Sequence, residues 1–294
     1  MSRAYTFSEL SLFQACPRKY QYKYEKLIDV VFDGVPRPVG RAIHKGVESI
    51  FLGLSKQEAT HAALAEYGDA LEEHALSDDP KIKKQMEDGK QQIVRCVEMY
   101  PYGNEGEVVA TEAVLEADMD DGRKYKGRLD LITKVNTALF VSDVKTTGFM
   151  LEPIVKSYRI SKQLPGYKFL AKVAGHAVDG CMVDVIKKPR VYHRKDGTWT
   201  ISGDEYHREP ITISERDEEE FFQWFHTLVD MVEVQRAKPQ GGWPMAPGEC
   251  FSFNRLCPYY EMCRFPERAE LLVDGVNFKR RTQLHPEYDE GEEE

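Results

Sequence analysis

The spacing of apolar residues changes near position 105, where a helical period gives way to alternation. Before this point, apolar side chains recur every three or four residues, as on the buried face of a helix. Thr6 and Glu9 have the spacing of a capping box, which predicts the start of the first helix. We expect a second helix from Pro17, with Tyr20, Tyr24 and Leu27 on one face, and a third through His44 to Phe51 after a connector at 33–40. Two more helices should occupy 56–100, with a turn at 77–80 between them.

Three short segments rich in β-branched and aromatic residues follow, at 108–117, 125–134 and 138–144. The turn signals Asp121-Gly122 and Asn136-Thr137 separate them, so we expect an antiparallel three-stranded run. The later segments predict a helix at 161–175, a strand at 180–186, a hairpin around Asp196-Gly197 and a charged helix at 214–235. This order of elements indicates an α/β architecture with a mixed sheet.

Composition places the chain among folded globular proteins. Its 294 residues are 41% hydrophobic and 30% charged, which excludes disorder as the main state. No apolar run approaches the ~18 residues of a membrane helix, and Met1–Leu10 lacks the basic start and apolar stretch of a signal peptide. We therefore expect a cytoplasmic protein without membrane contact.

The net charge of −9 is unevenly distributed, because six acids lie in the last eight residues. We expect residues 286–294 to form a disordered acidic tail. The rest of the chain contains two basic runs, which are Lys187, Lys188, Arg190, Arg194 and Lys195, and Lys279, Arg280 and Arg281. Such runs fit either a solvated face or a nucleic-acid partner, so charge alone does not decide between them.

Two acidic residues and a lysine are the strongest candidates for chemistry. Asp130 lies in one expected strand and Asp143 near the end of the next, so a hairpin can bring both carboxylates to one end of the sheet. Two converging carboxylates repel unless they share a cation, and their hard oxygens select Mg²⁺ or Mn²⁺. Lys145 follows Asp143 by two residues, which puts both side chains on one face of a strand. Its ammonium group can orient a water or stabilise phosphate charge.

This Asp…Asp-x-Lys pattern resembles the PD-(D/E)XK nuclease superfamily. Within it, the chain is similar to the RecB-like branch, which includes nuclease domains of helicase-nuclease complexes and CRISPR-adaptation exonucleases. His44 in Gly40-Arg-Ala-Ile-His44 matches the branch's metal-binding histidine. Gln163 and Tyr167 match its Gln-x-x-x-Tyr motif, and their spacing gives them one helix face. The opening from Phe7 to Tyr20, with Cys16-Pro17, resembles its amino terminus.

The resemblance implies a restriction-endonuclease-like core with a mixed central sheet flanked by helices. We expect four successive regions, namely an N-terminal helical region at 1–105, the nuclease core at 106–240, a cysteine-containing segment at 241–285 and the tail at 286–294. The implied metal ligands are His44, Asp130, Asp143 and the backbone carbonyl of Val144. Asp130, Asp143 and Lys145 would be catalytic, and Gln163 and Tyr167 would contact DNA. Glu112 and Glu48 are further candidates, with structural or supporting roles more expected than direct ones.

Six cysteines in a reduced compartment suit metal ligation or core packing better than disulfides. Cys96 on a helix and Cys181 on an apolar strand are typical of core residues. Four thiolates suit an iron–sulfur cluster or a zinc ion, and the candidates are Cys16, Cys250, Cys257 and Cys263. By resemblance they would hold a [4Fe–4S] cluster. Cys250 precedes Cys257 by seven positions, where many members have only two residues between these cysteines, so zinc and metal-free thiols stay open.

The resemblance implies a metal-dependent DNA nuclease, most simply an exonuclease on single-stranded or end-exposed DNA in recombination, repair or spacer processing. The alternatives are a DNA-end-binding or assembly module that acts through a partner, and an RNA-processing nuclease. The chain has no Gly-x-x-x-x-Gly-Lys-Ser/Thr signature. A helicase or another DNA-processing protein is therefore a candidate partner on a separate chain.

Overall fold

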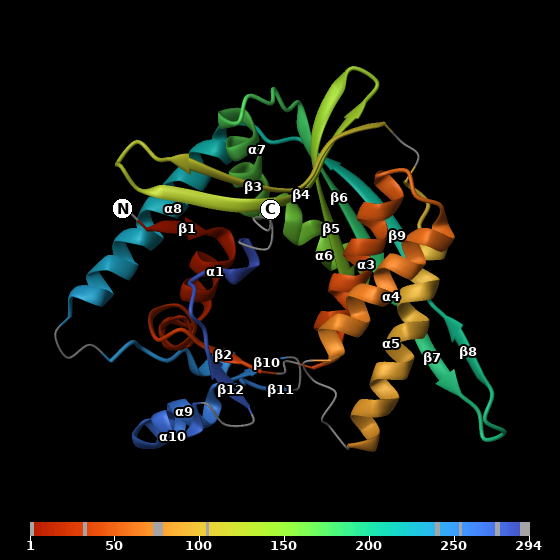
Figure 1. The fold of residues 1–294 in the computed structure, drawn as a ribbon. Helices are drawn as coiled ribbons and strands as arrows, with labels where there is room; N and C mark the ends of the chain where they lie inside the picture. Colours follow the sequence, from red (N-terminus) through yellow and green to blue (C-terminus); the bar gives the residue numbers. More distant parts are fainter. Residues whose placement is uncertain are drawn as a thin grey trace. The chain divides into compact units, whose positions relative to one another are not determined.

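The computed structural model describes residues 3–31, 34–72, 79–103, 106–238, 242–252, 255–273 and 277–288. They form two compact units (Figure 1). Unit 1 comprises Met1–Asp33, Glu116–Gly127 and Glu215–Glu294, and unit 2 comprises Gly34–Leu115 and Arg128–Ser214. These units cut across the four successive regions expected from the sequence, because the long strands β3, Glu107–Asp118, and β4, Lys124–Val135, each run from one unit into the other.

Three helices of unit 2 pack together, and their bounds are α3 Pro36–Phe51, α4 Lys56–Glu72 and α5 Pro80–Glu98. Helix α3 buries Val39, Ile43 and Val47, which recur at the helical period. It begins at Pro36, inside the segment expected to be a connector, because proline favours the first turn of a helix. The expected turn at 77–80 falls partly outside the described residues, which resume at Asp79 as the cap of α5.

The sheet of unit 2 has the order β4-β5-β6-β9, and β3 also pairs with β4. The remaining bounds are β5 Ala138–Thr147, β6 Gly180–Lys187 and β9 Glu205–Ile211. Strands β5 and β6 are parallel, whereas β4 with β5 and β6 with β9 are antiparallel, so the expected mixed sheet is confirmed. The crossover between β5 and β6 contains α6, Leu151–Arg159, and α7, Gln163–Val173. Strand β9 and helix α6 were not expected from the sequence.

A two-stranded hairpin follows β6, as the turn signal Asp196-Gly197 predicts. Its strands are β7, Arg190–His193, and β8, Trp199–Ser202. Gly197 has a φ of 84°, a left-handed conformation that glycine adopts without strain. The hairpin therefore turns where the sequence places its glycine.

Unit 1 contains both ends of the chain. Its first strand, β1, pairs in parallel with the first residues of β4, and Thr6 caps the next helix through a hydrogen bond from the Glu9 amide, 3.1 Å. The helix expected from Pro17 stops before Leu27, whose φ of 54° lies outside helical geometry. The bounds of the larger elements are β1 Ala4–Thr6, α1 Phe7–Ala15, α2 Pro17–Tyr20, the π-helical turn η1 Gln21–Glu25 and α8 Glu215–Ala237.

The C-terminal segment folds as a series of short elements, which are η2 Pro247–Glu249, β10 Phe251–Ser252, β11 Arg255–Leu256, α9 Tyr260–Arg264, η3 Pro266–Arg268, α10 Ala269–Leu272, β12 Phe278–Arg280 and η4 Pro286–Tyr288. Strand β12 pairs antiparallel with β2, Ile28–Val30, close to the N-terminus. Residues 289–294 of the expected acidic tail lie outside the described residues. In the described part of the chain, no helix is long and apolar enough to span a membrane.

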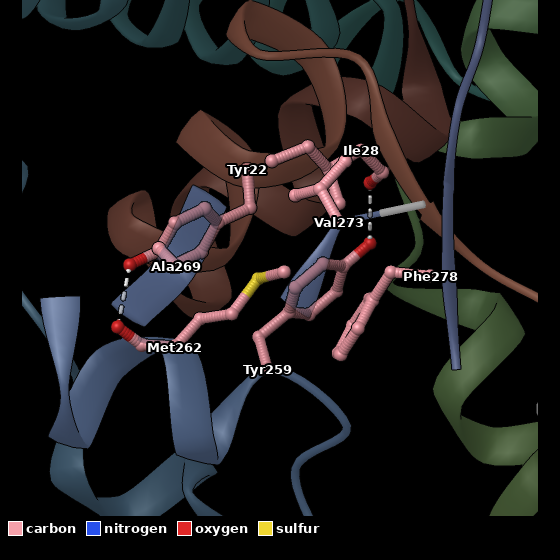
Figure 2. Close-up of a cluster of buried hydrophobic side chains, with 7 residues drawn as sticks. All are labelled: Tyr22, Ile28, Tyr259, Met262, Ala269, Val273 and Phe278. Carbon is pink, nitrogen blue, oxygen red and sulfur yellow. Dashed lines mark hydrogen bonds between the residues drawn. The ribbon is translucent and has the colours of Figure 1, made fainter. Parts of the chain in front are cut away.

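One hydrophobic cluster joins the N-terminal and C-terminal segments of unit 1 (Figure 2). The rings of Tyr22 and Tyr259 stack with centroids 5.7 Å apart. The Tyr22 hydroxyl donates to the Met262 carbonyl and the Tyr259 hydroxyl to the Ile28 carbonyl, each at 2.9 Å. Both buried hydroxyls are thereby satisfied, which removes the cost of burying them.

Candidate active site

Asp143 is the buried centre of the candidate site. It lies in the middle of β5, and its side chain has no exposed surface. Oδ1 accepts a hydrogen bond from Lys145 Nζ at 3.0 Å, because alternation along the strand puts both side chains on one face. Oδ2 is buried and has no hydrogen-bond partner among the described residues. A buried carboxylate oxygen without a donor is costly, so this atom suits a bound cation.

Asp130 and His44 complete an arrangement with Asp143. The Val144 amide donates to Asp130 Oδ2 at 2.8 Å, which fixes the Asp130 carboxylate beside β5. His44, on α3, places Nδ1 at 3.7 Å from the same oxygen. His44, Asp130 and Asp143 all belong to unit 2. The structure thus brings together the two acids and the histidine that the sequence singled out.

The charges at this site depend on one another. Burial raises the pKa of Asp143 to about 7, with Lys145 acting in the opposite direction and Asp130 in the same one. Burial lowers the pKa of Lys145, but Asp143 and Asp130 outweigh it and hold that pKa well above its ordinary value. Burial also lowers the pKa of His44, which favours a neutral imidazole with a free lone pair. A divalent cation with carboxylate and imidazole ligands would suit these groups, because it offsets the repulsion between the two acids.

Gln163 and Tyr167 support the acidic centre from helix α7. Gln163 Nε2 lies 3.4 Å from Asp143 Oδ1 and donates to the Tyr167 hydroxyl at 2.8 Å. The Gln163 and Tyr167 side chains are only 9% and 8% exposed. Their shared helix face was expected to meet DNA, but here it packs toward Asp143. In this conformation neither side chain offers a surface on which a base could stack.

Glu112 also lies close to Asp130, and Glu48 lies near Glu112. Burial and the negative charges of Asp130 and Glu48 together raise the pKa of Glu112 to about 7, against the opposing effect of Arg128. Glu112 ion-pairs with Arg128 at 2.9 Å and has a φ of 46° within strand β3. A left-handed residue in a strand is strained, and such strain is typical of a bulge that redirects a side chain. The structure thus places Glu112 beside Asp130.

Two further side chains at the site were missed in the sequence. Tyr158, on the unexpected helix α6, shares a hydrogen bond with Lys145, and burial raises the pKa of its hydroxyl. Asp184 is fully buried on β6, beside Val144, and ion-pairs with Arg208 at 2.6 Å. The signal for Asp184 was available, since an acid within an apolar strand needs a buried partner. Tyr158 carried no comparable signal.

The four candidate cysteines all belong to unit 1, whereas the residues of the acidic site belong to unit 2. Cys16 joins α1 to α2, Cys250 and Cys257 flank the hairpin of β10 and β11, and Cys263 lies on α9. The Cys257 amide donates to the Cys250 carbonyl at 2.8 Å, and Cys257 and Cys263 pack against the cluster of Figure 2.

The thiols of these cysteines influence one another. Burial raises the pKa of Cys263 to about 11, Arg18 lowers it, and the thiols of Cys257, Cys16 and Cys250 raise it. Cys16, Cys250 and Cys257 therefore lie within electrostatic range of Cys263. No three of their sulfurs, which all lie in the described ranges, come within 4.8 Å of one another. Sulfurs around a single tetrahedral zinc ion would be ~3.8 Å apart, given a Zn–S bond of ~2.3 Å.

A separate group with metal-ligand chemistry lies on the surface of unit 1, and no pattern in the sequence pointed to it. Asp120, Asp121 and His226 bring their ligand atoms within 4.8 Å of one another. Arg123 Nη1 already contacts Asp121 at 3.1 Å, and both aspartates are substantially exposed. Ion pairing with His226 and Arg123 accounts for this group without a metal.

A model of the PD-(D/E)XK nuclease superfamily matches residues 4–264. No curated protein sequence gives a significant match. Among solved structures, a provisionally named exonuclease from Eubacterium rectale is similar over 85% of this chain and 93% of its own, with 11% identity and a TM-score of 0.47. The structure of SSO0001 is similar over 42% of this chain and half of its own length, with 16% identity and a TM-score of 0.27.

Proposed function

Because the chain belongs to the PD-(D/E)XK nuclease superfamily, we propose that it is a metal-dependent DNA nuclease that hydrolyses phosphodiester bonds. Exonuclease action on single-stranded or end-exposed DNA is the favoured form. One observation supports this most directly, namely a fully buried Asp143 that contacts Lys145 through one oxygen and has no described partner for the other. In a purely structural ion pair both carboxylate oxygens would have hydrogen-bond donors, whereas a metal ligand keeps one oxygen available for the ion.

The metal would be Mg²⁺ or Mn²⁺, held by His44, Asp130, Asp143 and the backbone carbonyl of Val144. When bound, such an ion lowers the pKa of water and neutralises charge on the scissile phosphate. Lys145, protonated and held against Asp143, would donate to the phosphate oxygens as charge develops there. Tyr158 and Gln163 would position Lys145 and Asp143, respectively, through the hydrogen bonds described above.

The cysteines would form a second centre with a structural role. Cys16, Cys250, Cys257 and Cys263 would hold a [4Fe–4S] cluster, as in the RecB-like branch. Their electrostatic influence on one another supports a shared site, and no three of their sulfurs, all in described ranges, lie within 4.8 Å of one another. The cluster would tie Cys16 to the C-terminal segment, reinforcing the core of Figure 2. A helicase or another recombination or repair protein would be the partner that presents DNA.

The decisive experiment compares labelled single-stranded DNA, duplex DNA and RNA as substrates with Mn²⁺. The proposal requires cleavage of DNA by the parent protein and none by Lys145→Ala. The exposed Lys134→Ala variant is the matched control, because it removes a lysine charge away from the acids. Exclusive cleavage of RNA would favour an RNA-processing enzyme. DNA binding without any cleavage would favour an end-binding module.

A further inference from the structure

The hairpin of β7 and β8 contains Arg190, Arg194 and Lys195 of the longer basic run and has no part in the acidic site. In Figure 1 it extends beyond the sheet strands β6 and β9 of unit 2. Arg190, Arg194 and Lys195 are exposed, and in the described part of the chain none of the three forms an ion pair. Two aromatic side chains are also unusually open, since Tyr192 is 48% exposed and Trp199 45% exposed.

Several other surface cations of unit 2 are paired with acids. Lys156 pairs with Glu152, Arg159 with Glu209 and Lys187 with Glu205. Within the hairpin the single acid, Asp196, accepts hydrogen bonds from the Thr198 amide at 2.9 Å and the Thr198 hydroxyl at 2.7 Å, so it serves the turn. The hairpin therefore presents three cations without an acidic partner among the described residues, and its one acid is engaged in the turn.

The hairpin is held against α5 at both ends. Near the turn, His193 Nε2 contacts Asp88 on α5 at 2.6 Å, and at the base Gln92 on the same helix donates to the Pro189 carbonyl at 2.7 Å. On the sheet side, the Lys188 amide donates to the Thr147 carbonyl at 2.7 Å. A hairpin fixed in this way loses little conformational freedom when a ligand binds its outer part.

The hairpin also leaves the sheet at the end where the acidic site lies. In the register of β5 and β6, Lys145 is level with Val185 and Thr147 with Lys187, and β7 begins three residues later. From Val185 to the tip at Lys195 the chain can extend at most ~33 Å, at ~3.3 Å per residue. Phosphates along one DNA strand are ~3.4 Å apart, so the tip lies within ~10 nucleotides of a phosphate bound at Lys145.

We propose that this hairpin is an arm that binds the DNA backbone outside the active site. Arg190, Arg194 and Lys195 contact successive phosphates, and Tyr192 packs against the sugars or bases of the same strand. The inference rests on the proposed nuclease function, which supplies the DNA, but it makes a claim about binding alone. Since phosphate contacts are sequence-independent, the arm adds affinity without base specificity.

The test measures binding in EDTA, which prevents metal-dependent cleavage. Anisotropy of a fluorescein-labelled DNA strand of about 30 nucleotides, and of its duplex, is followed over a range of NaCl concentrations. For the double variant Arg194→Ala/Lys195→Ala, the slope of log K against log salt should decrease by about 1.4 to 1.8, because two phosphate contacts are lost. The matched double variant Lys134→Ala/Lys172→Ala also removes two exposed cations and should keep the parent slope.

Equal slopes for the parent and the hairpin variant would overturn the arm while leaving cleavage intact. A hairpin-dependent slope in a protein that never cleaves would instead retain the arm and reject the nuclease. Absence of any DNA binding by the parent would overturn both.

Discussion

Lys145 Nζ lies 3.0 Å from Oδ1 of Asp143, two residues earlier on the same strand, while Oδ2 of Asp143 is buried without a described partner. The protein therefore provides a positive partner for one oxygen of Asp143 and leaves the other oxygen available for a bound cation. This asymmetry separates the pair from an ordinary buried salt bridge, in which both oxygens need donors. It also assigns the two residues different tasks, with Asp143 as ligand and Lys145 as fixed positive charge.

Removing that charge should stop the chemistry. We expect Lys145→Ala to reduce the cleavage rate by at least ~100-fold, the usual cost of deleting one preorganised electrostatic contact. Steady-state cleavage of labelled DNA measures the effect, and circular dichroism checks the fold. Lys134→Ala serves as the control. Parent-like cleavage by Lys145→Ala, with contaminating nuclease excluded, would disprove the assigned mechanism.

Oδ2 of Asp143 should bind the metal ion. Asp143→Asn keeps the shape of the side chain but removes its charge, so we expect Mn²⁺ binding to weaken at least ~10-fold. Isothermal titration with Mn²⁺ measures this without any substrate. Glu152→Gln, which neutralises an exposed acid on α6, should bind Mn²⁺ as the parent does. Equal affinity in Asp143→Asn would remove Asp143 from the ligand set.

Tyr167 should act through Gln163. The Tyr167→Phe variant deletes only the hydroxyl that accepts the 2.8 Å hydrogen bond from Gln163. Loss of one such bond is worth ~1 kcal/mol, so kcat should decrease ~5-fold while KM stays unchanged. An increase in KM with unchanged kcat would instead indicate a direct contact with DNA. Phe169→Leu, on the same helix, is a control for packing.

The cysteine centre should be visible in the purified protein. Prepared without oxygen, the parent should be brown and contain about four iron and four sulfide per chain. Cys257→Ser should be colourless and melt at a lower temperature, because the site closes a very long loop. Cys96→Ala alters a buried cysteine of unit 2 and should keep the iron. Stoichiometric zinc in place of iron would preserve the site but reject the cluster.

Unit 1 should lose stability in acid through Glu25. Burial opposes ionisation of Glu25, but hydrogen bonds from Arg236 at 2.6 and 2.9 Å and from Arg3 hold its pKa below the ordinary 4.5. A carboxyl with a lowered folded pKa stabilises the protein above its unfolded pKa and loses this contribution as the pH decreases through the folded one. At pH 7 we expect Glu25→Gln to reduce the free energy of unfolding by ~1–3 kcal/mol.

Urea unfolding at a series of pH values tests this dependence. The difference between the parent and Glu25→Gln should shrink as the pH decreases below 4.5. The exposed Glu98→Gln variant should unfold like the parent throughout. A difference that stays constant with pH would mean that packing, and not charge, stabilises the protein at Glu25.

Local periodicity was enough to predict most elements. The capping pair of Thr6 and Glu9, the three strands around Asp121-Gly122 and Asn136-Thr137, and the hairpin at Asp196-Gly197 all follow rules that act within a few residues. Alternation along a strand likewise predicted that Asp143 and Lys145 share one face. Helix α6 was missed although Leu151, Ile154 and Val155 recur at the helical period. Strand β9 was missed because it contains Pro210, which argues against a strand except at a sheet edge, where β9 lies.

Thus the sequence by itself determined the α/β class, the residues with the chemistry and their pairing along single strands. Only the tertiary structure decided that Tyr158 meets Lys145, that Gln163 and Tyr167 are turned inward, and that Asp184 is paired across strands. It also decided that Cys16 shares a unit with the last fifty residues while His44 joins the other unit. Spacing along a chain encodes which side chains share a face, but which faces meet depends on how the elements pack, and no local rule contains that information.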